Sequence, residues 1–440
     1  MMRSTICRSI LLTLIAVSLV GWGTKPNAAQ ETVLYRFTGP PDGQFPLAGL
    51  LADAAGGFYG TTAAGGKTGS GTVFKLIPSG GIYKERVLHS FEGGSADGAQ
   101  PASDLIADKY GALYGTTYRG GTANAGTVFK LTRSGGGYTE SVLYSFKRGS
   151  DGSNPMAGLL ADSNGAFFGA TTGGGASGDG TVFTLTSFGT GYTESVLYSF
   201  KGGFDGSKPF GDLIADDSGA IYGTTSAGGY GGGLGLGDVV APACWARVGG
   251  CGTVFKLAPS GNGYTESVLY RFIGGSDGWG PTGALIWGAM GALYGTTDYG
   301  GGGCTGPVGS GTAFKLAPSS KGWYAETVIS HFDCLNTGDT LFAGLIVDGN
   351  GVLYGAASQG RFSNCGPGCG AVFSLTPSGS GYNETTLYGF CGDDCNDGAI
   401  PEGRLVIGAS GALYGTTNYG GAPSCHSYWG GCGTVFKLTP

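Results

Sequence analysis

The last eleven residues of the chain, GGCGTVFKLTP (residues 430–440), contain the phrase that decides the fold. The phrase GTVFKL, exact or with one or two substitutions, starts at residues 71, 126, 180, 252, 311, 370 and 433. Each earlier copy is followed by a segment similar to YTESVLYSF (residues 138–146), whereas the last copy has no such segment after it. The sequence therefore raises the question of which segment pairs with the final GTVFKL.

Two further phrases recur in step with GTVFKL. A segment similar to AGLLAD (residues 48–53) is followed by one similar to LYGTT, whose aromatic residue recurs once per unit as Tyr59, Tyr114, Phe168, Tyr222, Tyr294, Tyr354 and Tyr414. All four phrases are short, rich in residues that favour strands, and bounded by Gly, Asp, Asn, Ser or Pro, which is the usual punctuation of β-strands. We name the predicted strands A (AGLLAD), B (LYGTT), C (GTVFKL) and D (YTESVLYSF).

Four strands in a repeat of 54 to 72 residues are typical of a propeller blade. We therefore expect an all-β protein, a seven-bladed β-propeller of four-stranded blades, forming a single domain over residues 30–440. The alternative is a β-solenoid, but solenoid coils are shorter and lack alternating hairpin turns. The stretch ADSNGAF (residues 161–167) predicts such a hairpin turn, in which Gly165 supplies a positive φ.

The first predicted strand supplies a partner for the last one. ETVLYRF (residues 31–37) is a D strand with no C strand before it, and the chain ends on a C strand with no D strand after it. An unpaired strand edge is a hazard for aggregation, and closure of the ring removes it. We therefore predict that residues 31–37 pair with residues 433–438 in the seventh blade.

A charge pattern suggests a register for strands C and D. In four blades a lysine of C and a glutamate of D lie at mirrored positions about the hairpin, namely Lys75 and Glu85, Lys130 and Glu140, Lys256 and Glu266, and Lys315 and Glu326. Lys437 in the last C strand and Glu31 in the first D strand occupy the same two positions. We interpret these as structural cross-strand pairs, each contributing about 0.2–1 kcal/mol.

The composition limits the class of function. The formal charge is −6 and no run of Lys or Arg occurs, so nucleic acid is a poor partner. Residues 1–29 resemble a secretory signal, with Arg3 and Arg8 before the apolar residues 10–20 and a small-residue site before Gln30. A membrane anchor is the alternative, but this run is shorter than the ~20 residues of a span. We expect an exported monomer without a membrane span in the mature chain.

Cysteine usage agrees with export. The mature chain has ten cysteines, all expected in D-to-A or B-to-C connections of blades 4–7, and an even number suits disulfides. We expect the bonds Cys244–Cys251, Cys425–Cys432 and Cys304–Cys334. Cys365, Cys369, Cys391 and Cys395 pair either within or between their two loops, and zinc bound by these four thiolates is the alternative.

The same face carries two candidate ligand-binding features. Aspartates followed by glycine, with a proline four positions after the aspartate, recur at Asp42, Asp97, Asp151, Asp205, Asp277 and Asp397. They either form a calcium- or sugar-binding ring or shape each loop as Asx turns, and we favour the turns and expect no cofactor. Loop aromatics offer stacking surfaces for a ligand, or else pack the inserted loops; they are Tyr230, Trp245, Trp279, Tyr299, Tyr419, Tyr428 and Trp429.

The phrases GALYGTT, GTVFKLTPSG and SVLYSF resemble the tandem repeat named GloVer, after Gloeobacter and Verrucomicrobia, of bacterial choice-of-anchor proteins. The resemblance implies an exported or cell-surface bacterial protein. Such proteins often carry a C-terminal anchor, and because this sequence stops at Pro440 we expect release or periplasmic residence.

The function that we expect is binding of an extracellular ligand, a glycan or a protein, on the disulfide-rich face of blades 4–7. A polysaccharide lyase or glycoside hydrolase acting at the central opening is one alternative, and a structural surface protein is another. The three histidines show no metal-binding spacing and no Gly-x-Ser-x-Gly motif accompanies them, so we predict no catalytic residues and no metal.

Overall fold

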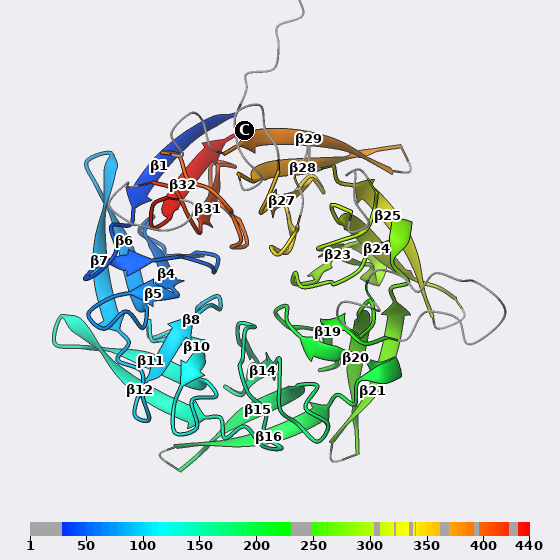
Figure 1. The fold of residues 1–440 in the computed structure, drawn as a ribbon, viewed down its shortest axis with the longest axis horizontal. Coiled ribbons are helices and arrows are strands. Elements are labelled where there is room, and N and C mark those ends of the chain that lie inside the picture. Colours follow the sequence, from blue (N-terminus) through cyan, green and yellow to red (C-terminus); the bar gives the residue numbers. More distant parts are fainter. Residues whose placement is uncertain are drawn as a thin grey trace, which may run out of the picture.

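The computed structural model describes residues 29–189, 191–229, 244, 249–261, 263–302, 309–320, 323–333, 338, 340–360, 369–379, 381–390, 396–421 and 430–440. Seven antiparallel sheets stand around a central axis, each with a short strand A nearest the axis and strand D on the outside (Figure 1). The predicted seven-bladed β-propeller is thus confirmed.

The first four blades follow one another along the chain. Blade 1 contains β3 (Leu51–Ala52), β4 (Phe58–Thr62), β6 (Thr72–Ser79) and β7 (Ile82–Ser90). Blade 2 contains β9 (Ile106–Ala107), β10 (Leu113–Gly120), β11 (Thr127–Ser134) and β12 (Gly137–Ser145). Blade 3 contains β13 (Leu160–Ala161), β14 (Phe167–Thr171), β15 (Thr181–Phe188) and β16 (Gly191–Ser199). Blade 4 contains β18 (Ile214–Ala215), β19 (Ile221–Ala227), β20 (Thr253–Ser260) and β21 (Gly263–Arg271).

The last three blades complete the ring. Blade 5 contains β22 (Ile286–Trp287), β23 (Leu293–Thr297), β24 (Thr312–Pro318) and β25 (Tyr324–His331). Blade 6 contains β26 (Ile346–Val347), β27 (Leu353–Ala357), β28 (Ala371–Ser378) and β29 (Gly381–Gly389). Blade 7 contains β30 (Val406–Ile407), β31 (Leu413–Thr417), β32 (Thr434–Thr439) and β1 (Gln30–Arg36). Shorter elements lie in the connections: β2 (Gly43–Gln44), β5 (Ala64–Gly65), β8 (Gly98–Pro101), β17 (Ser207–Pro209) and the 3-10 helices η1 (Gly203–Asp205), η2 (Gly275–Asp277) and η3 (Ala289–Gly291).

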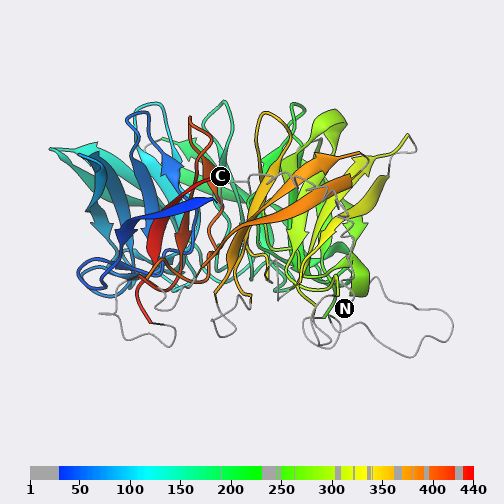
Figure 2. The same ribbon diagram turned by 90° about the horizontal axis from the view of Figure 1, so that it is seen from above.

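The first strand closes the ring, as predicted. β1 pairs antiparallel with β32, from Gln30 opposite Thr439 to Arg36 opposite Thr434. Figure 2 shows β1 running alongside β32 when the ring is viewed from its side. The strand missing after the last GTVFKL is therefore supplied by the start of the described chain.

The repeated glycine of LYGTT lies beneath the repeated phenylalanine of GTVFKL. A Cβ atom added at Gly60 would lie 2.5 Å from the ring of Phe74, and the other six blades have the same close approach, at 2.5 to 2.8 Å. The phenylalanine in turn packs against the aromatic residue that ends strand D of the preceding blade. These interblade pairs have ring centroids 4.6 to 5.1 Å apart; they are Phe37–Phe74, Phe91–Phe129, Phe146–Phe183, Phe200–Phe255, Phe272–Phe314, Phe332–Phe373 and Phe390–Phe436.

The two threonines of LYGTT make hydrogen bonds inside the core. The second one bonds the threonine of GTVFKL, as in Thr62 to Thr72 with 2.8 Å between the hydroxyl oxygens. The first one reaches the next blade: the Thr416 hydroxyl donates to the Ala48 carbonyl at 2.9 Å. Buried hydroxyls need such partners, so the first threonine helps to fix how a blade lies against its neighbour in the five blades that have it. Blades 3 and 6 have Ala170 and Ala356 at this position.

The predicted pairing of lysines in C with glutamates in D is wrong. The hairpin turn has two residues, Gly80 and Gly81, at φ 60° and 88°, so Lys75 lies opposite Arg86 and Glu85 lies opposite Leu76. Successive side chains of a strand point to opposite faces, so Lys75 and Glu85 lie on different faces of the sheet. The same one-residue shift separates Lys130 from Glu140, Lys256 from Glu266, Lys315 from Glu326 and Lys437 from Glu31.

The lysine has a different set of partners. Lys75 Nζ lies 2.6 Å from the Asp53 carboxylate and 3.0 Å from the Tyr59 hydroxyl. Tyr59 is the LYGTT tyrosine opposite Lys75 on strand B, and it is buried. Tyr114, Tyr222 and Tyr294, at the same position in other blades, are also buried. The A-to-B turn also has the predicted form, with Gly165 at φ 83°.

Candidate functional site at the channel mouth

The segments that lead into strand A in all seven blades line one cavity on the propeller axis. The cavity has a volume of about 250 Å³ and is formed by segments that connect strand D of one blade to strand A of the next. Its lining residues are Leu47–Gly49, Ala102–Asp104, Met156, Phe210–Asp212, Thr282, Ala284, Phe342–Gly344 and Glu402–Arg404. Every blade therefore contributes to this central site.

A second cavity of about 580 Å³ continues the first toward blades 1–4. The two share Leu47, Ala102, Met156 and Phe210, which form an apolar shelf. The second cavity is also lined by residues in or directly after the end of strand B and by D-to-A residues; they are Ala63, Gln100, Tyr118, Thr172, Lys208 and Ser226. It therefore opens on the face that carries the D-to-A and B-to-C connections. We call the two cavities together the channel mouth.

Three charged side chains from three different blades meet in the first cavity. An Arg404 guanidinium nitrogen lies 3.2 Å from the Asp104 carboxylate. Asp212 is the third charged group, and its Oδ1 accepts a hydrogen bond from the Gly158 backbone nitrogen at 2.6 Å. Asp104 makes the equivalent bond to the Gly49 nitrogen, also at 2.6 Å. The backbone of the preceding blade thus holds each carboxylate in place.

The pKa values of Asp212 and Arg404 depend on the charges beside them. Burial raises the pKa of Asp212, the charge of Asp104 raises it further, and Arg404 lowers it. The Asp104 charge holds the pKa of Arg404 above its ordinary value. Two carboxyl groups and one guanidinium leave an excess of negative charge when both carboxyl groups are ionised. The Arg404 side chain is 39% exposed and lines the cavity, so part of it is accessible to a ligand.

The wall of the mouth at blades 5 and 7 holds two further carboxyl groups. The Thr282 hydroxyl donates to Asp298 at 2.6 Å, and burial raises the pKa of Asp298 to about 8. The Asn418 side-chain amide donates to Glu402 at 3.2 Å, and burial raises the pKa of Glu402 to about 7. Glu402 therefore takes up and releases a proton near neutral pH, which is the property of a general acid or base.

Sequence reasoning missed this cluster because its members are far apart in the chain. A signal for it does exist in the repeat. Asp104, Asp212 and Arg404 occupy the position at which the other blades have Gly49, Gly158, Ala284 and Gly344. Charged residues at a position that is otherwise Gly or Ala are departures from the repeat, and aligning the seven copies would single them out.

The described loop aromatics pack the connections. Trp279 is 4% exposed and stacks on Tyr299, with 4.3 Å between ring centroids. Tyr419 is partly buried and lies 5.0 Å from the ring of Phe45. The structure brings Trp279 and Tyr299 together and places Tyr419 beside another blade. Tyr230, Trp245, Tyr428 and Trp429 lie outside the described residues.

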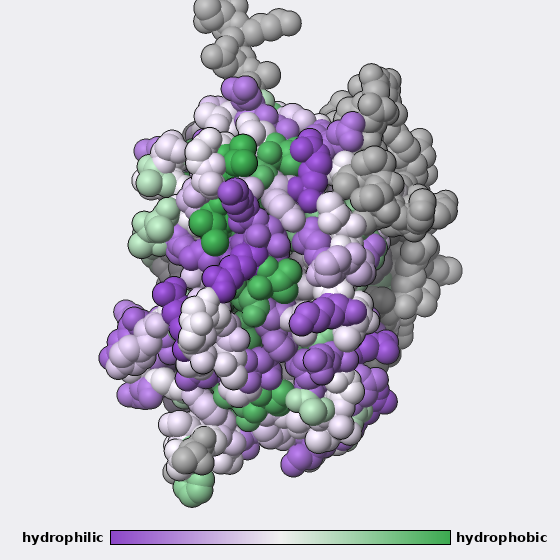
Figure 3. Space-filling model, turned by 90° about the vertical axis from the view of Figure 1, so that its left-hand side faces the viewer, coloured by the Kyte–Doolittle hydropathy of each residue, from purple (hydrophilic) through white to green (hydrophobic). Residues whose placement is uncertain are grey.

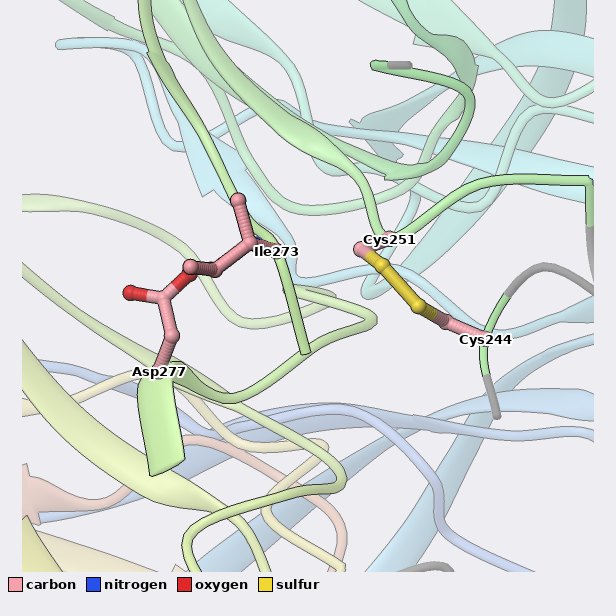
Figure 4. Close-up of a disulfide and its surroundings, with 4 residues drawn as sticks. All are labelled: Cys244, Cys251, Ile273 and Asp277. Carbon is pink, nitrogen blue, oxygen red and sulfur yellow. A yellow bond between two sulfur atoms is a disulfide. The ribbon is translucent and has the colours of Figure 1, made fainter. Parts of the chain in front are cut away.

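One of the expected disulfides is present in the described residues. Cys244 and Cys251 are bonded, with 5.1 Å between their Cα atoms (Figure 4). Both side chains are buried and pack near Trp279 in the core between blades 4 and 5. Cys369 takes part in a disulfide as well, and so does Cys432. Cys304, Cys334, Cys365, Cys391, Cys395 and Cys425 lie outside the described residues.

The aspartates of the Asp-Gly loops accept hydrogen bonds from the backbone of their own loops. The backbone nitrogens of Thr38 and Gly43 donate to the Asp42 carboxylate at 2.9 and 2.6 Å. Figure 4 includes another of these loops, in which the Ile273 nitrogen donates to Asp277 at 2.7 Å. These bonds are those of a carboxylate that shapes a turn.

Comparison with known proteins identifies the repeat. No curated protein matches the chain. Among solved structures, a Lactobacillus plantarum protein has 14% sequence identity and a TM-score of 0.48, covering 86% of this chain and 98% of that one. A Bacteroides uniformis protein named as a 6-phosphogluconolactonase has 13% identity and a TM-score of 0.47, covering 84% and 89%. A luciferin-regenerating enzyme has 11% identity and a TM-score of 0.41, covering 94% and 95%.

These structural likenesses are too distant to carry an argument about activity. The family comparison is more specific. The family model described as the Gloeobacter/Verrucomicrobia repeat matches residues 20–236 and 246–429, which is most of the chain and agrees with the resemblance in its repeated phrases. The chain therefore belongs to the Gloeobacter/Verrucomicrobia repeat family.

Proposed function

We propose that this protein is an exported β-propeller that binds an extracellular ligand, a glycan or a peptide, at the channel mouth. The observation that carries the proposal is the set of Asp104, Asp212 and Arg404, placed where other blades have Gly or Ala. Removing charge from water is unfavourable unless the charges are well paired. The ring does not need these charges to form, since four blades lack them, so a ligand is a direct reason for their presence.

The composition of the mouth suits a ligand with both apolar and polar surfaces. Small-molecule sites are concave and mostly apolar, with a few polar groups that fix orientation. Here Leu47, Met156 and Phe210 supply the apolar shelf, and the exposed part of Arg404 supplies hydrogen-bond donors. The predicted loop aromatics of the same face, Tyr299 and Tyr419 among them, are proposed as additional contacts around the opening.

Export rests on the N-terminal signal and the disulfides. The bond between Cys244 and Cys251 is compatible with an oxidising compartment. Among the described residues, no helix has the length and apolar character of a membrane span. The signal segment lies outside the described residues, so export remains part of the proposal.

An acid–base enzyme at the same mouth is the second candidate. It is favoured by Glu402, whose pKa of about 7 suits proton transfer at neutral pH. Asp104, held beside Arg404, would be the second carboxyl group of such a site. A lyase or glycosidase acting on a polysaccharide is the activity class that uses this chemistry.

A glycan array followed by product analysis tests both candidates. The wild-type protein is compared with the triple variant Asp104→Ala, Asp212→Ala, Arg404→Ala, which carries at these positions the residue that blade 5 has at Ala284. Glycan binding that wild type shows and the triple variant lacks would support the proposal. Shortened products would identify the enzyme instead, and Glu402→Gln would then abolish their formation. If wild type binds no glycan, and if the triple variant binds peptides as well as wild type does, the ligand does not bind at the mouth and the proposal is wrong.

A further inference from the structure

The outer ends of the blade junctions contain a repeated pair of side chains. A tyrosine of strand D, two residues before the interblade phenylalanine, donates its hydroxyl to the aspartate of the Asp-Gly loop that follows. The hydrogen bonds are 2.6 to 3.0 Å long and join Tyr35 to Asp42, Tyr144 to Asp151, Tyr198 to Asp205, Tyr270 to Asp277 and Tyr388 to Asp397.

A glutamate of the next blade faces each of these aspartates. In six blades the Oε1 atom of this glutamate is buried and has no hydrogen-bond partner; the residues are Glu31, Glu85, Glu140, Glu194, Glu266 and Glu326. A buried polar atom without a partner is unfavourable. Each of these six junctions therefore has an acceptor atom to which a hydrogen-bond donor or a cation could bind.

The junction of blades 1 and 2 has a histidine in place of the tyrosine, and the junction of blades 5 and 6 has Ser330. His89 Nε2 lies 3.3 Å from Asp97 Oδ2. His89, Asp97 and Glu140 each place one ligand atom within 4.8 Å of the others, and among the described residues they are the one set of three His, Cys, Asp or Glu side chains that does so. His89 is on β7, Asp97 follows β7, and Glu140 is on β12 of the next blade.

We propose that His89, Asp97 and Glu140 form a binding site for a divalent first-row transition-metal ion, with Zn²⁺ as the best match. Zinc binds imidazole nitrogen and carboxylate oxygen, and open zinc sites use three protein ligands and one water. Ligands about 2.0–2.1 Å from zinc in a tetrahedron lie roughly 3.3 Å apart. The separation of His89 Nε2 from Asp97 Oδ2 already has this value, and small side-chain rotations bring in Glu140.

The surroundings hold the ligands in position and leave a route for the ion. The backbone nitrogens of Glu92 and Gly98 donate to the Asp97 carboxylate at 2.7 and 2.6 Å, as supporting hydrogen bonds do in metal sites. The His89 ring packs edge-on against Phe91, at 4.7 Å between centroids. The side chains of His89 and Asp97 are 20% and 13% exposed, so an ion reaches them from solvent.

The site lies on the outside of the ring, on strands far from the channel mouth (Figure 1). Figure 3 shows this side of the molecule, where hydrophilic residues surround separate apolar patches. An ion bound here would join the outer strands of blades 1 and 2. It would also satisfy the buried Glu140 oxygen that has no partner in the protein. The proposal is independent of the ligand proposed for the mouth.

The repeat supplies matched variants for the test. His89→Tyr gives this junction the residue that five other junctions have, so the variant is expected to fold like wild type. Zn²⁺ binding to tag-free, EDTA-stripped protein is measured by calorimetry, and Co²⁺ absorption reports the coordination geometry. We expect one Zn²⁺ equivalent more on wild type than on His89→Tyr, and a tetrahedral Co²⁺ spectrum that the variant lacks.

A gain-of-site variant tests whether histidine is the determining residue. Tyr144→His places a histidine beside Asp151 and Glu194 at the junction of blades 2 and 3, and we expect it to bind one Zn²⁺ more than wild type. Equal binding by wild type and His89→Tyr would overturn the proposal, because any zinc would then be held elsewhere. Failure of Tyr144→His to gain an ion would contradict the role assigned to the histidine.

Discussion

The ring of Phe37 packs edge-on against the ring of Phe74, with 5.1 Å between centroids, and joins the first described strand to blade 1. Phe37 follows β1, which belongs to blade 7, so this contact lies at the junction where the ring closes. Both side chains are fully buried. The equivalent contact within the continuous part of the ring is Phe146 with Phe183, at the same 5.1 Å.

We expect Phe37→Ala and Phe146→Ala to destabilise the protein by similar amounts. Truncation of a buried phenylalanine costs about 3–5 kcal/mol, and a closed ring makes the two junctions equivalent. Urea unfolding followed by fluorescence measures the free energy of unfolding of each variant. A much smaller effect of Phe37→Ala would contradict closure by β1.

Deleting residues 31–38 tests the closing strand itself. The deletion removes nearly all of β1 and leaves β32 as an exposed edge strand. Exposed edges promote association with other chains, so we expect a lower melting temperature and concentration-dependent aggregation. Calorimetry and light scattering at several concentrations measure both effects. A truncated protein that melts like the full chain would show that the pairing is dispensable.

The glycine of LYGTT should not tolerate a methyl group. Gly60→Ala would place Cβ 2.5 Å from the Phe74 ring, and overpacking of this kind costs typically about 1–3 kcal/mol. Gly191→Ala is the control, because nothing lies within 4 Å of its added Cβ. We expect a clear loss of stability for the first variant and almost none for the second, measured by urea unfolding. Equal stability of the two variants would contradict the packing described here.

Stability should fall as the pH rises from about 5 to 8. Burial, and next the charge of a facing aspartate, raises the pKa of Glu31, Glu85, Glu140, Glu194, Glu266 and Glu326 to about 7. Between the ordinary value of 4.5 and the folded value of about 7, the folded state binds more protons than the unfolded state. The free energy of unfolding therefore decreases with pH in this window.

Replacing one of these glutamates isolates the effect. Glu85→Gln removes the ionisation while keeping the shape of the side chain, so we expect it to raise the melting temperature at pH 8 and to change it little at pH 5. Glu92→Gln, on an exposed side chain, is the control. Melting curves across this pH range provide the measurement. A Glu85→Gln variant that is less stable than wild type at pH 8 would contradict the assignment.

The sequence predicted the fold in detail because the repeat carries redundant information. Seven copies of LYGTT and GTVFKL specify strands, and the unpaired first and last strands specify closure. The register of strands C and D was not predicted correctly, because it depends on the length of a glycine-rich turn. Gly80 and Gly81 form a two-residue turn with both φ values positive, and this moves Lys75 one position away from Glu85.

The charged cluster of the channel mouth was not predicted, for a different physical reason. Arg404 and Asp104 are brought together by the closure of the whole ring, and no local pattern in the chain reports such a contact. The mouth opens on the D-to-A and B-to-C connections, which are the connections that contain the cysteines and the predicted loop aromatics. His89 and Glu140 were not predicted as a site for the same reason as the charged cluster. They come from neighbouring blades, and their spacing in the chain matches no known motif.

The pairing of β1 with β32 also has a consequence for the timing of folding. Gln30 is made before the first six blades, whereas its partner Thr439 is made after them. Contacts between residues so distant in the chain form slowly, and partly folded chains with unpaired strand edges are prone to aggregate. The first strand therefore stays without its partner until the other blades have been made, and during this interval its edge can pair with another chain.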